Sequence, residues 1–240
     1  MPHTQRHRGQ HSLDPRLFHP QQLPVLNQAV KDMSYLLTRG YGENGALKLV
    51  GDRYRLTQRQ RKAVLRASCS DQALAYRLAN MLEPADIQNQ AVVVDGYNLL
   101  ITVESALGGG IVLACRDSCY RDIASVHSTY RKVAETLPAL TLIGTHLRSL
   151  GCSHITWYLD APISNSGRLR HNMLALSEEK HFGWEVLLAN NPDKKIAASE
   201  ESIAISSDSW VIDHSRRWFN LHRFIVDQIP GAHLIALRGS

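Results

Sequence analysis

The chain has 240 residues, 44% of them hydrophobic and 20% charged, which is enough for one large domain or two small ones with a substantial core. No apolar run approaches the roughly 20 residues that cross a bilayer, and the N-terminus lacks a secretory signal, so we expect no membrane association. Four scattered cysteines are too few for a disulfide framework, which predicts reduced thiols in a cytoplasmic protein.

The net charge of +5 is concentrated in the first part of the chain. Residues 1–90 hold 13 Lys or Arg against 7 Asp or Glu, whereas residues 91–240 hold 14 against 15. A basic N-terminal part suggests contact with a polyanion. A solvated basic surface that binds nothing fits the same numbers, so the charge alone leaves both interpretations open.

Residues 1–24 are rich in His, Gln, Arg and Pro, and this composition predicts a flexible tail. Helical spacing begins afterwards, with Leu26, Ala29, Val30 and Met33 on one face of an amphipathic helix. We therefore predict a helical domain over residues 25–83.

A basic helix is predicted after Thr57, which resembles an N-cap. Its cationic residues make the helical domain a candidate for nucleic-acid binding, and they are Arg59, Arg61, Lys62 and Arg66. A plain helical bundle with a solvated basic helix is the alternative.

Residues 83–90 are polar and contain Pro84, and we place a domain boundary there. From residue 91 onward, short apolar runs alternate with helical segments, at 91–95, 154–159, 184–189 and 202–206. This alternation predicts an α/β domain with a parallel sheet over residues 91–228. The glycine-rich stretch 102–110 is predicted to be a loop.

Each of these four apolar runs is followed by a carboxylate, at Asp95, Asp160, Asp193 and Asp208. Since the carboxyl ends of parallel strands share one edge of a sheet, the four aspartates would converge on one acidic pocket. Clustered carboxylates repel one another unless a cation lies between them, and hard oxygen ligands suit Mg²⁺ or Mn²⁺. Each aspartate taken alone could equally be a helix cap or a turn residue.

The motif VVVDGYN resembles the first strand of the PIN-like superfamily, especially its NYN branch of metal-dependent ribonucleases. The later stretches YLDAP, NPDKK and ISSDSWVID follow in the order in which such domains present their other acidic residues. Roughly residues 25–225 also resemble an uncharacterised prokaryotic family that pairs a helical domain (domain of unknown function 434) with a PIN-like domain. The stretch LVGDRYRLTQRQRKAVLRAS resembles the helical part, and VDGYNLLITVES and LDAPISNSG resemble the PIN-like part.

The resemblance implies a PIN-like fold in which the four aspartates are catalytic carboxylates and bind the metal. It makes Asn98 a further ligand, Asp213 an outer partner, and Lys194, Lys195 and Arg168 contacts for the nucleic acid. NYN domains tend to carry a second acid two residues after the last aspartate, where this chain has Trp210. That departure leaves open whether the site holds one ion or two.

These observations lead to three hypotheses. The first is a metal-dependent endoribonuclease, a hydrolase that cuts RNA with an activated water. The second is a non-catalytic RNA-binding module that keeps the fold, and the third is a metal-dependent phosphatase for a small molecule. Fewer than three carboxylates within reach of one ion would favour the binding module, and a basic approach to the aspartates would favour the nuclease over the phosphatase.

Overall fold

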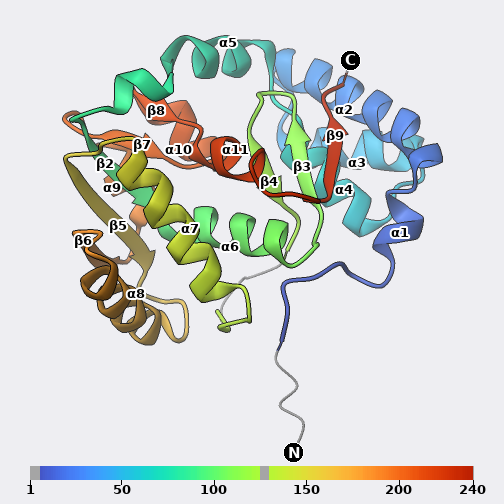
Figure 1. Cartoon of the computed structure of the whole chain (residues 1–240). Coiled ribbons are helices and arrows are strands. Elements are labelled where there is room, and N and C mark those ends of the chain that lie inside the picture. Colours follow the sequence, from blue (N-terminus) through green and yellow to red (C-terminus); the bar gives the residue numbers. More distant parts are fainter. Residues whose placement is uncertain (1–5, 125–129, 240) are drawn as a thin grey trace, which may run out of the picture.

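A computed structural model describes residues 6–124 and 130–239, and Figure 1 shows its α/β architecture. The larger sheet is parallel throughout. Its six strands lie in the order β1 (Met81–Leu82), β8 (Trp218–Phe219), β7 (Ile203–Ile205), β2 (Ala91–Asp95), β5 (His154–Asp160) and β6 (Trp184–Ala189). The predicted parallel sheet is therefore confirmed, together with a helical N-terminal region.

Strand β2 lies inside this sheet because both of its faces are apolar. Val92 and Val94 belong to the main hydrophobic core, whereas Val93 belongs to a second core on the opposite face. Gly96 follows at once, and a Cβ there would lie 2.8 Å from the carbonyl oxygen of Tyr158. Glycine is thus required by the close approach of β5, rather than by an unusual turn.

Helices cover both faces of the parallel sheet. The main core on one face takes residues from α6 (Gly96–Leu107), α7 (Thr136–Ser149), α8 (Ser166–Lys180) and α11 (Leu221–Val226). The second core takes residues from α9 (Pro192–Ala197) and α10 (Ser209–His214). The loop predicted over residues 102–110 was wrong for most of its length, because α6 continues to Leu107 and buries Val103 in the core.

The helices of the N-terminal region lie on the side of the molecule away from β5, β6 and α8 (Figure 1). Its helices are α1 (Asp14–Leu17), α2 (Leu23–Thr38), α3 (Glu43–Arg53), α4 (Gln58–Ala67) and α5 (Asp71–Asn80), with 3₁₀ turns at Pro20–Gln22 and Pro84–Ile87. Thr57 caps α4 as predicted, since its side chain accepts a hydrogen bond from the backbone of Gln60. No helix of the described chain is long and apolar enough to cross a membrane.

A second sheet joins this helical region to the rest of the chain. It contains β4 (Tyr120–Asp122), β3 (Val112–Cys115) and β9 (Leu234–Leu237), in that order. Leu113 and Ile235 from this sheet share a hydrophobic core with Leu26 and Val64 from the helices. The helical region and the later chain therefore do not have separate cores, and the chain beyond residue 228 belongs to the fold.

A flexible tail was predicted over residues 1–24, of which residues 1–5 lie outside the described part, whereas residues 14–24 contain α1, a 3₁₀ turn and the start of α2. Leu17 and Phe18 are buried in the core that the helices share with the second sheet. The Asp14 side chain is fully buried and forms an ion pair with Arg59. Composition concealed this because only two apolar residues of the segment, Leu17 and Phe18, become buried.

Candidate functional site

The four predicted aspartates lie at the carboxyl edge of four adjacent strands. Asp95 and Asp160 are the last residues of β2 and β5, Asp193 lies in the first turn of α9 after β6, and Asp208 is the N-cap of α10 after β7. From β2 the chain first adds β5 and β6 on one side, and then β7 on the other. The gap between β2 and β7 is thus a topological switch point, where parallel α/β sheets bind their ligands.

All four aspartates line a single cavity of about 250 Å³, which we call the acid pocket. Its lining also includes Asn98, Tyr97 and one aspartate that the sequence analysis missed, Asp122. Arg66 is the one basic residue that lines it among the described residues. The pocket therefore holds five carboxylates against a single guanidinium.

Asp95 is one of the two buried carboxylates of this pocket, with 8% of the residue exposed against 5% for Asp122. Its pKa is raised to about 8, mainly by burial and also by the charges of Asp208 and Asp193, against hydrogen bonds that lower it. One of these bonds comes from the Ser206 hydroxyl, which donates to Oδ2 of Asp95 at 2.7 Å. Among the described residues, an ionised Asp95 thus has no positive partner, and a cation would stabilise it.

Asp193 and Asp160 belong to the same electrostatic group. Burial raises the pKa of Asp193, and the neighbouring charges of Asp208 and Asp160 raise it further. Burial also raises the pKa of Asp160, whose side chain makes no hydrogen bond to another residue in the described ranges. Carboxylates with raised pKa values gathered in one cleft are candidates for a functional site.

A short segment after β7 holds the wall of the pocket in place. Oδ1 of Asp208 accepts hydrogen bonds from the backbone of Trp210 at 2.9 Å and Val211 at 3.2 Å, as an N-cap does. Oδ1 of Asn98 accepts from both the backbone and the hydroxyl of Ser207, each at 2.9 Å. Asn98 therefore orients this segment, and its oxygen already takes two hydrogen bonds.

Asp122 and Ser206 were missed by the sequence analysis. Asp122 ends β4, a three-residue strand without a long apolar run, and its Oδ1 accepts from the backbone of Ala124 at 2.6 Å. Arg66 approaches its other oxygen at 3.4 Å. The sequence feature that could have identified Ser206 is its position directly after the apolar run 203–205, two residues before Asp208.

The donor chemistry of the pocket fits a hard divalent cation, because every carboxylate presents oxygen ligands. The spacing is not that of a closed coordination shell. Within residues 6–124 and 130–239, no three His, Cys, Asp or Glu side chains are placed so that they could hold one ion. Binding would therefore require some of the aspartate side chains to rotate.

Asp213, predicted as an outer partner of the site, lies elsewhere. It does not line the acid pocket but forms two hydrogen bonds with Arg77, at 2.6 and 2.7 Å. The expectation of an outer role beside the metal ligands was wrong, because α10 turns this residue toward α5.

The basic residues of α4 also differ from the expectation of a free cationic face. Arg59 pairs with Asp14, Arg61 with Asp52 at 2.7 Å, and Arg66 donates to the Asp122 carbonyl at 2.5 Å. Lys62 donates to the carbonyl of Ala124 at 2.8 Å. These side chains join α4 to its neighbours, so the positive charge of this helix is engaged in contacts within the molecule.

The remaining predicted cations stay accessible. Lys194 and Lys195 are exposed on α9, directly after Asp193, and make no ion pair with another described residue. Arg168 is exposed on the first turn of α8 and lines a separate cavity beside the acid pocket.

Comparisons with known proteins place the chain in a family without an assigned activity. Residues 84–224 match the family described as a domain of unknown function, DUF5616, and because this match spans more than half of the chain, the protein belongs to that family. Residues 25–79 match a second family, the proteins of unknown function DUF434.

One relative is an uncharacterized protein of the archaeon Methanocaldococcus jannaschii. It is 29% identical over 199 residues, which cover 78% of this chain and 93% of the relative. No solved structure matches the chain.

Proposed function

We propose that the protein is a metal-dependent endoribonuclease with a PIN-like catalytic region. The observation that carries this proposal is the meeting of Asp95, Asp193 and Asp208 at the switch point of a parallel sheet, where the buried Asp95 has no positive partner among the described residues. The choice of RNA rests on the resemblance of VVVDGYN to NYN ribonucleases. The exposed side chains of Lys194, Lys195 and Arg168 near the pocket favour a nuclease over a small-molecule phosphatase.

In this proposal Asp95, Asp193 and Asp208 would hold Mg²⁺ or Mn²⁺, with Asn98 fixing the segment that carries Asp208. The bound ion would offset charge on the phosphodiester in the transition state. Asp160 has no hydrogen-bond partner among the described side chains and can accept a proton from the attacking water. The water oxygen bonds to phosphorus, the bond from phosphorus to the bridging oxygen breaks, and a proton passes to the leaving oxygen.

The test is cleavage of end-labelled single-stranded RNA with Mg²⁺ or Mn²⁺ by the wild type and by Asp95→Asn. The amide keeps the shape of the side chain but removes its charge, so we expect metal-dependent cleavage to fall by at least about a hundredfold. Asp86→Asn is a matched control, because Asp86 is an exposed capping residue outside the pocket.

Equal cleavage by the wild type and Asp95→Asn would overturn the assignment of the site. If the wild type shows no metal-dependent cleavage, the proposed nuclease activity is overturned.

A second function, a non-catalytic RNA-binding module, is favoured by one observation. No three potential ligands of the described chain are placed to hold an ion together. Salt-dependent RNA binding by a wild type that never cleaves would support this function.

A further inference from the structure

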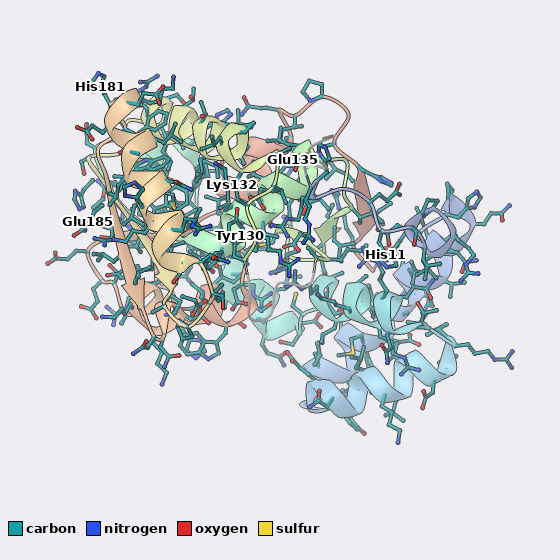
Figure 2. All side chains as sticks on the ribbon, turned by 90° about the horizontal axis from the view of Figure 1, so that it is seen from below. His11, Tyr130, Lys132, Glu135, His181 and Glu185 are labelled. Atoms are coloured by element: carbon teal, nitrogen blue, oxygen red, sulfur yellow. The ribbon has the colours of Figure 1, made fainter. Side chains whose placement is uncertain are left out.

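A second cavity, of about 280 Å³, has a charged lining that is entirely positive. We call it the basic cavity. Arg131 and Lys132 come from the segment before α7, and Arg168 comes from the first turn of α8. Tyr130, Asn165 and Asn172 contribute its polar lining. Figure 2, seen from below, labels Tyr130 and Lys132 next to α8.

The three cations have no partner in the part of the chain that the structure describes. Each is exposed, and none of their side chains forms an ion pair or a hydrogen bond with another described residue. This contrasts with α4, whose arginines are paired internally. Three like charges around one hollow repel one another, and a ligand with several anionic oxygens would relieve that repulsion.

The wall that carries these cations is held by hydrogen bonds. Tyr130 is buried, and its hydroxyl contacts both Glu104 and the hydroxyl of Thr136. The Asn165 amide donates to the Tyr130 carbonyl at 3.0 Å, which ties the segment to the start of α8. Arg8 pairs with Glu104 at 2.8 Å and also reaches the carbonyl of Arg131. The backbone is thus positioned before any ligand arrives.

The basic cavity adjoins the acid pocket through an aromatic pair. Tyr97 lines the acid pocket, Tyr130 lines the basic cavity, and their ring centroids lie 5.3 Å apart. The lining residues Ile163 and Asn165 are only two positions apart in the chain, so their Cα atoms lie within about 7 Å. The Tyr97 hydroxyl is buried and has no hydrogen-bond partner among the described residues. One extended ligand can therefore contact both cavities.

We infer that the basic cavity binds a backbone phosphate of single-stranded RNA while a neighbouring phosphodiester lies at the acid pocket. The inference rests on the proposed function and names how its substrate is held. Single-stranded nucleic acids are bound by positive grooves that follow the backbone, beside aromatic side chains. A site that binds only a small phosphate ion would not need to adjoin a second, acidic cavity.

The test is the binding of a fluorescent single-stranded RNA in EDTA, measured by anisotropy over a salt series. The variant is the double substitution Lys132→Gln with Arg168→Gln, and the control is Lys48→Gln, an exposed lysine on α3. We expect the slope of log affinity against log salt to fall by about 0.7 for each phosphate that the double variant no longer neutralises. The control should keep the wild-type slope.

An unchanged slope in the double variant would overturn the inference, as would inorganic phosphate competing as strongly as RNA, which would indicate a small-anion site. Because binding is measured without metal, its outcome is independent of cleavage. Loss of binding in the double variant of a protein that never cleaves would keep the inference and reject the nuclease. Cleavage that depends on Asp95 but not on Lys132 and Arg168 would support the nuclease and reject the inference.

Discussion

The molecule contains two buried clusters of charge that differ in how they are balanced. In the first, which we call the ion cluster, Asp117 contacts Arg77 at 2.5 Å and Arg121 at 2.7 Å, and Arg77 also pairs with Asp213. Burial alone would raise the pKa of Asp117, but the two guanidinium groups hold it well below its ordinary value. The acid pocket has the opposite balance, since Asp95 meets other carboxylates and its pKa is raised.

The two clusters are neighbours, which makes the difference informative. Arg121 donates to the carbonyl of Ser207 at 2.6 Å, and Ser207 in turn bonds to Asn98 at the acid pocket. A positive group is therefore available directly behind the pocket, yet it is directed at Asp117 instead. The ion cluster joins α5, β4 and α10, whereas the acid pocket has five carboxylates and a single guanidinium among the described residues.

The largest effect is expected from Asp117→Asn, which leaves two buried guanidinium groups without their shared carboxylate. Breaking a buried ion pair in this way costs about 3–5 kcal/mol. Urea denaturation of the variant should show this loss in the free energy of unfolding. A loss below about 1 kcal/mol would contradict a structural role for the ion cluster.

A smaller effect of pH is expected from Asp95 in metal-free protein. The folded state keeps the Asp95 proton up to a pKa of about 8, whereas the unfolded chain loses it near 3.8, so stability falls as pH rises between these values. We therefore expect the free energy of unfolding of the wild type to fall over this range relative to that of Asp95→Asn.

Denaturation of both proteins in EDTA across this pH range measures the difference. Parallel stability curves for the wild type and Asp95→Asn would show that the carboxylate is not desolvated as described.

The smallest effect is expected from Arg223→Gln, which removes an exposed ion pair with Asp227 at 3.4 Å. Both side chains are almost half exposed, and such pairs contribute at most about 0.5 kcal/mol. Thermal denaturation should barely distinguish this variant from the wild type. A loss comparable to that of Asp117→Asn would remove the distinction between buried and exposed pairs.

Local sequence patterns were enough to predict the strands of the parallel sheet near the pocket. Strand β6 spans the predicted residues 184–189, and β5 ends one residue later than predicted, at Asp160. Both are apolar runs with little competing helical spacing. Once such strands are parallel and adjacent, the meeting of their terminal aspartates follows from topology.

The remaining features depend on contacts between distant residues. Strand β3 pairs with β9, so that Val112 faces Leu234, and no local pattern near residue 112 specifies that partner. Arg59 meets Asp14 from a segment whose composition resembles a tail. Asp122 reaches the acid pocket through a short hairpin, so its place among the carboxylates became visible only in three dimensions.

The central claim is that the carboxylates of the acid pocket bind a divalent cation. Its most direct test is calorimetric titration of Mn²⁺ into metal-free wild type, Asp95→Asn and the control Asp86→Asn. We predict saturable binding to the wild type and to the control, and a loss of binding in Asp95→Asn. No binding to the wild type, or equal binding to all three proteins, would contradict the claim.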